Sequence, residues 1–228
     1  MENIAETLKK TLARIDSAEK EYGRPAGSVS LLAISKTHPA GRILEAVRAG
    51  QNRFGENYAQ EAFEKISALH QHDLEWHFIG PVQSNKSRLL AENFDWLHSL
   101  DRIKVAIRLN ESRPTHLPPL NVCIQVNISG EVSKSGVEPG EVHELVKLIL
   151  TLPRLKLRGL MVIPAAQTDF ELQRQAFRQT RILQEQLNES GLGLDTLSMG
   201  MSDDLEAAIA EGSTMVRIGT AIFGVRQT

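Results

Sequence analysis

The stretch Ser30-Leu-Leu-Ala-Ile-Ser-Lys36-Thr-His-Pro39 places an apolar run directly before a lysine. The run is typical of a short buried strand, and Lys36 stands where that strand ends. Apolar neighbours around the stem of a lysine desolvate it, which lowers its pKa and leaves more of the neutral amine that reacts with an aldehyde. A lysine at a strand end also often extends into water, and this segment taken alone favours that simpler interpretation.

Outward from this strand, the whole chain alternates apolar runs with helical patterns. The eight predicted strands are Val29–Ser35, Asn52–Gly55, Glu75–Ile79, Trp96–Ser99, Asn121–Ile128, Lys156–Val162, Thr196–Met199 and Thr214–Gly219. The predicted helices are 3–21, Arg42–Ala49, Tyr58–Leu69, Ser84–Glu92, Ile103–Glu111, Pro139–Thr151, Phe170–Glu189 and Asp203–Ala210. The clearest helical pattern, Phe170–Glu189, is followed by two glycines, as expected beyond a helix C-terminus.

This alternation predicts an α/β fold with a parallel sheet, because parallel neighbours need crossover connections. Right-handed crossovers repeated along the chain close into a single (β/α)8 TIM-type barrel, here with an extra N-terminal helix. An open doubly wound sheet is the competing architecture, but no Gly-x-Gly-x-x-Gly follows the first strand. No linker, repeat or low-complexity tract divides the chain, so we expect one domain over residues 1–228.

The composition argues against several classes of partner. A net charge of −2 and 5% aromatic residues do not favour binding to nucleic acid or to an anionic membrane. The one cysteine, Cys123, rules out an internal disulfide and lies in an apolar run, as an inert buried thiol does. The N-terminus has no secretory pattern and no apolar run reaches bilayer length, so we expect a cytoplasmic protein without a membrane segment.

Several polar residues stand where the predicted strands end, which is where the functional site of such a barrel forms. Asn57 follows the second strand, where it either caps the next helix or offers its amide to a ligand. His77 lies in the third strand among apolar residues, which favours a core histidine over a catalyst. No group of His, Cys, Asp and Glu has ligand spacing, so we expect no metal site.

Two segments near the end of the chain favour binding of a phosphate group. Leu197-Ser-Met-Gly-Met-Ser-Asp-Asp204 and Met215-Val-Arg-Ile-Gly-Thr-Ala-Ile-Phe-Gly224 leave the last two predicted strands. Barrels often bind phosphate there, through backbone N–H groups and a short helix. Ser198 and Thr220 supply hydroxyl groups, and Gly200 and Gly219 let the backbone approach an anion.

Arg217 lies in the last predicted strand between two apolar residues, so its guanidinium needs a buried partner. That partner is either a carboxylate, such as Glu206 or Asp203, or an aromatic ring nitrogen in the site. An imine-forming lysine, a phosphate cup and an inward arginine together fit pyridoxal 5′-phosphate (PLP). This cofactor carries an aldehyde, a phosphate and a pyridine nitrogen on one ring.

With these residues in view, the chain strongly resembles the pyridoxal phosphate homeostasis protein family, which is related to the N-terminal barrel of bacterial alanine racemases. The resemblance spans nearly the full length, and its blocks are highly specific when taken together. They are Leu32-Ala-Ile-Ser-Lys-Thr37, Phe54-Gly-Glu-Asn-Tyr58, Trp76-His-Phe-Ile-Gly80, Gln83-Ser-Asn-Lys86, Val126-Asn-Ile-Ser-Gly130, Arg158-Gly-Leu-Met161, Leu197-Ser-Met-Gly-Met-Ser202 and Val216-Arg-Ile-Gly-Thr220.

The resemblance implies a role for each candidate residue. Lys36 would hold PLP as a Schiff base, Arg217 would face the pyridine nitrogen, and Asn57 would line the pocket. The residues implied for the phosphate are Ser198, Gly200, Gly219 and Thr220. The family is associated with binding PLP and keeping vitamin B6 and amino-acid pools in balance, without established turnover. It also implies a monomer, with PLP-dependent apoenzymes as transient recipients of the cofactor.

Departures from the alanine racemases indicate which chemistry is missing. Those enzymes have a tyrosine four residues beyond the lysine, where this chain has Ala40, and a second domain that brings another tyrosine, whereas this chain ends at Thr228. Racemisation needs acid/base groups on both faces of the ring, so we expect no catalytic residues. His38 stands where the family often has a second lysine, which puts a relay of PLP between two lysines in question.

Two other functions compete with that of a PLP-binding regulatory protein. One is a PLP-dependent racemase-like enzyme of low activity, because the barrel is shared and Lys36 is itself a possible base. The other is a barrel that binds a phosphate ligand such as a sugar phosphate, with Lys36 neutralising the anion. An arginine facing the ring argues against the first, because a guanidinium keeps its proton and leaves the pyridine a poor electron sink.

Overall fold

Eight parallel strands close into a barrel, with each strand pairing to the next along the chain and the last pairing to the first. The structure is a computed structural model that describes residues 3–131 and 134–224. The strands are β1 (Ser30–Ile34), β2 (Arg53–Glu56), β3 (Glu75–Phe78), β4 (Trp96–Leu100), β5 (Leu120–Gln125), β6 (Leu155–Met161), β7 (Thr196–Ser198) and β8 (Met215–Ile218). The predicted (β/α)8 barrel is therefore confirmed, and the open doubly wound sheet is excluded.

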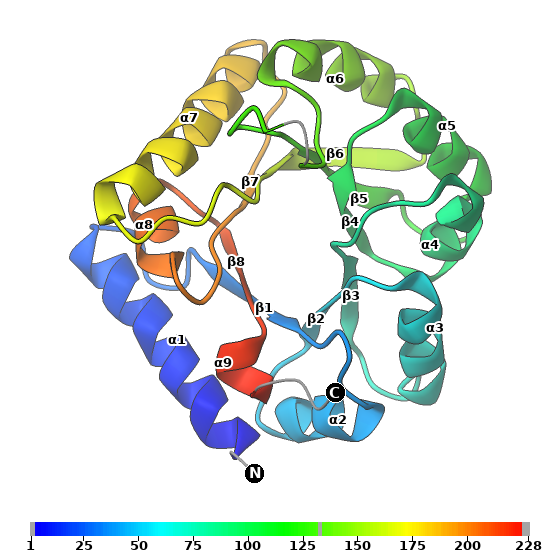
Figure 1. Cartoon of the computed structure of the whole chain (residues 1–228). Helices are drawn as coiled ribbons and strands as arrows, with labels where there is room; N and C mark the ends of the chain where they lie inside the picture. Colours follow the sequence, from blue (N-terminus) through cyan, green and yellow to red (C-terminus); the bar gives the residue numbers. More distant parts are fainter. Residues whose placement is uncertain (1–2, 132–133, 225–228) are drawn as a thin grey trace.

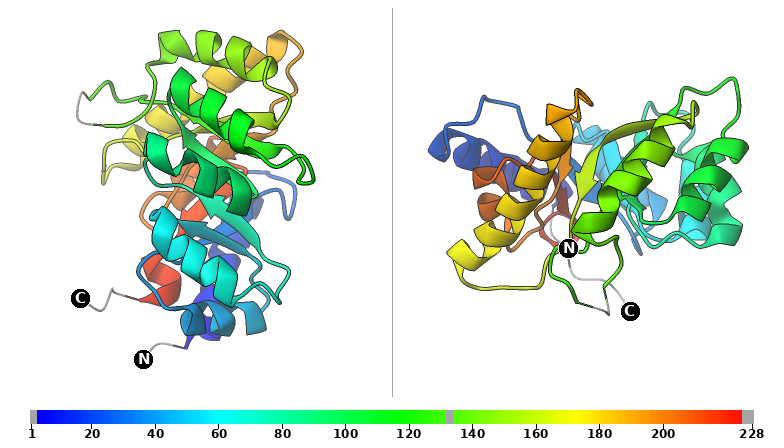
Figure 2. Two further views of the ribbon diagram at one scale, coloured as in Figure 1. Left: turned by 90° about the vertical axis from the view of Figure 1, so that its right-hand side faces the viewer. Right: turned by 90° about the horizontal axis from the view of Figure 1, so that it is seen from above.

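Helices form an outer layer around these strands, as Figure 1 and the two views of Figure 2 show. They are α1 (Ile4–Glu21), α2 (Ala40–Arg48), α3 (Ala59–Ala68), α4 (Ser87–Asn93), α5 (Ile103–Ser112), α6 (Val142–Leu150), α7 (Phe170–Glu189), α8 (Leu205–Ala210) and α9 (Thr220–Phe223). Short 3-10 turns, η1 (Ser84–Lys86) and η2 (Pro139–Glu141), precede α4 and α6. Throughout the described residues, none of the helices has the length and apolar character needed to cross a bilayer.

The N-terminal helix α1 is extra to the eight-fold repeat and covers the outside of the barrel next to α8 and α9 (Figure 1). Asn3 caps it, because the Asn3 side chain accepts a hydrogen bond of 3.0 Å from the Ala5 backbone N–H. Its apolar face, which includes Ile4, Leu8 and Ile15, is buried in the main core between strands and helices. The helix thus supports the segment after β8, where the sequence predicts a phosphate site.

The barrel interior is filled by side chains that alternate along each strand. Leu32 and Ile34 of β1 form one interior cluster with Met215, and Trp96, Cys123 and Met161 form another. Gly55 of β2 leaves room for this packing, since a Cβ there would lie 2.5 Å from Ile34 Cδ1. Cys123 is fully buried, which confirms its assignment as a buried thiol, and this burial raises the pKa of the thiol to about 12.

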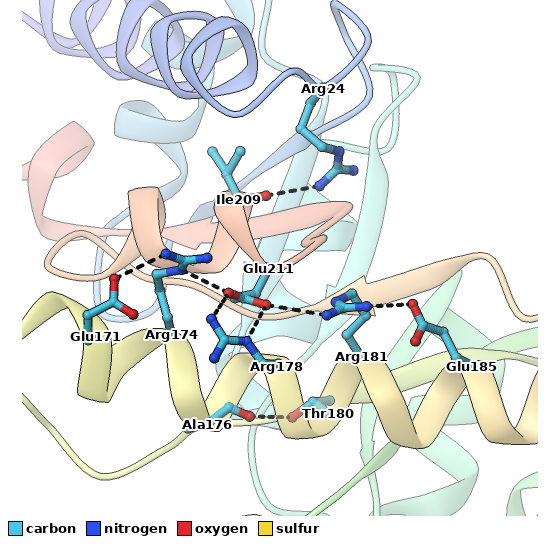
Figure 3. Close-up of polar contacts among 10 residues, drawn as sticks. All are labelled: Arg24, Glu171, Arg174, Ala176, Arg178, Thr180, Arg181, Glu185, Ile209 and Glu211. Carbon is cyan, nitrogen blue, oxygen red and sulfur yellow. Dashed lines mark hydrogen bonds and ion pairs between the residues drawn. The ribbon is translucent and has the colours of Figure 1, made fainter.

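A buried carboxylate fastens α7 to the turn that leads into β8. Glu211, at the end of α8, is only 3% exposed and accepts from Arg174 at 2.8 Å and Arg178 at 2.9 Å. Arg181 adds an ion pair at 3.6 Å, so three successive turns of α7 converge on one carboxylate (Figure 3). Burial alone would raise the pKa of Glu211, but the hydrogen bonds from Arg178 and Arg174 outweigh it and hold the pKa below its ordinary value.

Candidate functional site

A pocket of about 620 Å³ opens among the segments that follow the barrel strands, a size typical of small-molecule sites. Five of the seven candidate residues line it together, namely Lys36, Asn57, Arg217, Gly219 and Thr220. Its other described lining residues are Arg14, Ile34, Ile79, Ile163, Met201, Ser202, Asp203 and Ala221. The barrel thus brings residues from both ends of the chain to a single concave site.

Lys36 follows β1 by two residues, and the backbone on both sides of it is anchored. Lys65 Nζ donates to the carbonyl oxygen of Ser35 at 2.8 Å, and Glu61 Oε1 accepts from the backbone N–H of Thr37 at 2.5 Å. Thr37 adopts a φ of 65°, which side chains with a Cβ rarely take. Lys36 itself is half-buried. Its position in the pocket is therefore set by neighbours held from α3.

The anchoring group, which we call the Lys65 cluster, consists of Glu56, Glu61 and Lys65. Lys65 Nζ lies 2.6 Å from Glu56 Oε1 and 2.5 Å from Glu61 Oε1, and the hydroxyl of Ser35 also donates to Glu56 at 2.7 Å. Burial raises the pKa of Glu56, although the charge and hydrogen bond of Lys65 act in the opposite direction. The cluster places a buried ion pair, Glu56 with Lys65, behind the strand that leads to Lys36, and the charge of Lys65 offsets part of the cost of burying the Glu56 carboxylate.

Arg217 extends from β8 into the interior beneath the pocket and is buried. Its Nη1 donates to both the carbonyl oxygen and the hydroxyl of Ser198, the latter at 2.9 Å, and its Nη2 donates to Val162 O at 2.8 Å. These bonds use three of the five N–H groups of the guanidinium. Burial lowers the pKa of Arg217 to about 10, so it remains a cation at neutral pH.

The sequence offered Glu206 or Asp203 as a carboxylate partner for Arg217, but neither accepts a hydrogen bond from it in the described residues. Glu206 instead pairs with Arg14 at 2.8 Å, on the outer side of the pocket. Asp203 lines the pocket and is exposed. Arg217 is therefore held by oxygen atoms of β7 and of the segment after β6.

Ser198 and Gly200 lie below the pocket wall. The Ser198 hydroxyl is fully buried, at 2.8 Å from His98 Nδ1 as well as 2.9 Å from Arg217. Gly200 has a φ of 99°, and its carbonyl oxygen accepts from the backbone N–H of Arg217 at 2.9 Å. Direct contact of these two residues with a phosphate stays a prediction. Ser202 is a pocket-lining hydroxyl that the sequence analysis did not single out, although it ends the same Ser-Met-Gly-Met-Ser motif.

The segment after β8 forms the opposite rim. Gly219 packs closely on β1, since a Cβ there would lie 3.3 Å from Ile34 O. Thr220 begins α9, a short helix after the last strand, and the first helical bonds run from Ile222 and Phe223 to the carbonyl oxygen of Gly219. The N–H groups of the first turn precede these bonds and are suited to an anionic ligand.

Asn57 provides the test of whether a polar cofactor fits this pocket. Tyr58, not Asn57, is the N-cap of α3, so the capping role considered for Asn57 is wrong. Its Oδ1 is buried and has no hydrogen-bond partner among the described residues. A buried amide oxygen without a donor in the wall of a pocket indicates a ligand that supplies one. Together with an arginine below and a lysine at the side, this fits a polar aromatic cofactor such as PLP.

The chain matches known proteins over nearly its whole length. The family model for the alanine racemase N-terminal domain covers residues 11–227. The pyridoxal phosphate homeostasis protein of Vibrio cholerae is 55% identical, over 99% of this chain and 98% of that protein.

The chain belongs to the pyridoxal phosphate homeostasis protein family. A solved member of similar fold is PipY of Synechococcus elongatus with PLP bound, which has a TM-score of 0.82 and 37% identity. That likeness covers 97% of this chain and the whole of PipY. Alanine racemase from Corynebacterium glutamicum has a TM-score of 0.69 at 18% identity, covering 99% of this chain and 62% of that enzyme, and so shares the fold. The resemblance inferred from the sequence motifs is thereby confirmed.

Proposed function

We propose that this protein binds PLP in the pocket at the strand ends and acts in intracellular vitamin B6 homeostasis and amino-acid balance. The observation that carries the proposal is the convergence of Lys36, Asn57, Arg217, Gly219 and Thr220 on one pocket. The binding of PLP by PipY, which is alike over its whole length, supports it. The family name shared by relatives such as the Vibrio cholerae protein supports the homeostatic role.

Within this pocket each residue is assigned a task that its position allows. Lys36 Nζ is proposed to hold the cofactor covalently as a Schiff base, for which PLP supplies the aldehyde carbon and from which one water leaves. Arg217 donates an N–H group to the pyridine nitrogen, and Asn57 Oδ1 accepts from the cofactor. The residues proposed to bind the phosphate are Gly200, Gly219 and Thr220, joined by Ser202. Ser198, whose hydroxyl is engaged by His98 and Arg217, is proposed to contribute through its backbone only.

We further propose that the bound cofactor is held without turnover. Racemisation needs a proton donor and a proton acceptor on opposite faces of the ring. Among the described residues that line the pocket, the only side chains of the kinds that usually act as general acids or bases are those of Lys36 and Asp203, and Asp203 is exposed. A guanidinium at the ring nitrogen also limits how far negative charge spreads into the ring.

Titration with PLP tests the binding function. Full-length wild-type protein is expected to develop the absorbance of bound PLP with saturation at one equivalent, and Lys36→Ala is expected to lose that absorbance. A wild type that cannot be loaded with PLP would refute the function, and a barrel for another phosphate ligand would then be favoured.

A separate measurement decides between holding and turnover. The loaded protein is incubated with L-amino acids in deuterated water, and exchange of the α-proton is followed by NMR. We expect no exchange above that of free PLP. Exchange at enzymatic rates that disappears in Lys36→Ala would instead establish the racemase-like alternative.

We also propose that the protein works as a cytoplasmic monomer, that residues 1–228 form one domain, and that PLP passes transiently to apoenzymes. Residues 1–2, 132–133 and 225–228 of that domain lie outside the described residues. The barrel strands, which run from β1 to β8 without an inserted domain in the described chain, support the single unit. Analytical ultracentrifugation of the loaded protein tests whether it is a monomer, and a sedimenting species of twice the chain mass would contradict this.

A further inference from the structure

A row of polar side chains, four of them buried, crosses the barrel interior from one end to the other. Glu75 Oε1 lies 2.8 Å from His77 Nε2, and His77 Nδ1 lies 2.9 Å from His98 Nε2. His98 Nδ1 lies 2.8 Å from Ser198 Oγ, which lies 2.9 Å from Arg217 Nη1. The five residues come from β3, β4, β7 and β8, and both histidines are fully buried. We call this row the interior relay.

The chemistry of its two ends fixes the direction of every hydrogen bond in the relay. Arg217 has only donors, so Ser198 Oγ accepts from it and keeps its O–H free to donate a hydrogen bond to His98 Nδ1. An ionised Glu75 has only acceptors, so His77 donates from Nε2 and accepts at Nδ1. His98 must then carry its proton on Nε2. With both histidines neutral, one arrangement satisfies all four contacts, and every donor points from Arg217 toward Glu75.

The electrostatic surroundings favour neutral histidines. Burial lowers the pKa of His77, although the hydrogen bond and charge of Glu75 and the charge of Asp95 oppose this. Burial, together with His77 and Arg217, lowers the pKa of His98 well below its ordinary value. The hydrogen bond from His77 lowers the pKa of Glu75 despite partial burial, so this carboxyl is ionised at neutral pH.

The two ends of the relay lie at opposite ends of the barrel. Arg217 lines the proposed PLP pocket, whereas Glu75 is the first residue of β3 and lines a separate hollow of about 410 Å³. The Glu75 side chain is 38% exposed there and also pairs with Arg53 at 3.2 Å. Trp96 stacks on His77 with ring centroids 5.4 Å apart, which restrains that ring between its two partners.

We propose that His77 and His98 are positioning residues that hold the Ser198 hydroxyl as an acceptor for Arg217 and thereby fix the guanidinium at the proposed PLP pocket. The inference rests on the proposed function for the contact between Arg217 and the cofactor. Without an acceptor at His98 Nδ1, the Ser198 hydroxyl has no fixed orientation toward Arg217. One of the three described hydrogen bonds of the guanidinium is then weakened, while those to the carbonyl oxygens of Ser198 and Val162 remain, so the guanidinium is held less firmly at the pocket.

The direction of the relay is tested first on the full-length protein freed of cofactor. Long-range proton–nitrogen NMR of the imidazole rings is expected to show His77 and His98 neutral and protonated on Nε2 at neutral pH. Protonation of either ring on Nδ1, or a cationic ring, would overturn the relay. This result does not depend on PLP binding, so it separates a failure of the relay from a failure of the proposed function.

The coupling to the cofactor is tested with variants at His98, which does not line the pocket. His98→Leu is expected to weaken binding of PLP and of pyridoxal by the same factor, about tenfold or more, because a hydrogen bond to a charged group is weakened. His98→Asn, whose Oδ1 can replace the Nδ1 acceptor, is expected to recover part of the loss, and His98→Gln, which keeps only the outer donor, is not.

Cys123→Ala is the matched control, because it changes interior packing next to Trp96 without removing a member of the relay. Thermal unfolding of each variant shows that the barrel is folded before affinity is compared. Unchanged affinity in folded His98→Leu, or an equal loss in Cys123→Ala, would overturn the proposal. A loss for PLP that is absent for pyridoxal would also overturn it, because the effect would then reside at the phosphate.

Discussion

Removal of the charge at the centre of the Lys65 cluster is expected to destabilise the barrel strongly. Lys65 is 7% exposed and Glu56 is not exposed, and they lie 2.6 Å apart. In Lys65→Met the Glu56 carboxylate remains buried but loses the positive charge that pairs with it. Breaking a buried pair in this way costs about 3–5 kcal/mol of folding free energy. For a chain of this size that corresponds to a melting temperature lower by about 6–20 °C.

The pH dependence of this loss has a definite sign. Burial already raises the pKa of Glu56 above its ordinary value of 4.5, and loss of Lys65 raises it further. A carboxyl with a raised folded-state pKa favours the folded protein when protonated, so its penalty grows as pH rises through that value. The difference in stability between wild type and Lys65→Met is therefore expected to shrink as pH falls from neutral toward 4.5.

Chemical unfolding followed by circular dichroism measures this effect, and a second substitution tests its cause. Glu56→Gln combined with Lys65→Met removes both charges and keeps an amide oxygen for the Ser35 hydroxyl. The double variant is expected to recover most of the lost stability. Equal stability of wild type and Lys65→Met, or a double variant no better than Lys65→Met, would refute the reasoning. Because Lys65 also anchors the carbonyl oxygen of Ser35, weaker PLP binding by Lys65→Met is expected as well.

Glu211→Gln should lower folding stability by about 1–3 kcal/mol at neutral pH, since it weakens three partly exposed ion pairs. Because the pKa of Glu211 is lowered, this contribution is present above its ordinary value of 4.5 and is lost on acidification, so the two proteins should converge in acid unfolding curves. Gly200→Ala should destabilise by about 1–3 kcal/mol, because its φ is 99° and the new Cβ would lie 2.6 Å from Ala208 Cβ, and an unchanged melting temperature would contradict this. Asn57→Ala should weaken PLP binding about fivefold or more without lowering folding stability, because Asn57 Oδ1 has no hydrogen bond to lose in the described residues. A loss of stability with unchanged affinity would be inconsistent with a ligand-binding role.

The barrel is predictable from the sequence because its signal is repeated. Each short apolar run is separated from the next by a helical pattern. A closed barrel then gives every parallel strand a hydrogen-bonded neighbour on both sides. Two pocket segments are also predictable, because each is local in the sequence. They are the end of β1 next to Lys36 and the segment after β8 with Gly219 and Thr220. Helix starts are less predictable. The segment predicted to begin at Ser84 opens with a 3-10 turn whose N-cap is Gln83.

Contacts across the barrel interior are not visible in a linear pattern. His77 and His98 stand 21 residues apart, and both are inward-facing on neighbouring strands, yet only His77 stands out from the sequence as a buried residue. His98 lies in a strand, Trp96–Leu100, that is buried at every position, and its partners depend on strand register. Of the two serines in the Ser-Met-Gly-Met-Ser motif, Ser198 ends β7 and lies beneath the pocket, whereas Ser202 follows β7 and lies at the pocket wall. The partner of Arg217 could not be chosen from the sequence for the same reason.

Mapping of the covalent bond between the protein and PLP tests the central claim most directly. Full-length protein loaded with PLP is reduced with borohydride, digested and analysed by mass spectrometry, with Lys36→Ala treated in parallel. We expect one reduced adduct per chain, on Lys36, and none in the variant. A loaded protein whose adduct lies on another lysine, or that retains the same adduct yield in Lys36→Ala, would contradict the account.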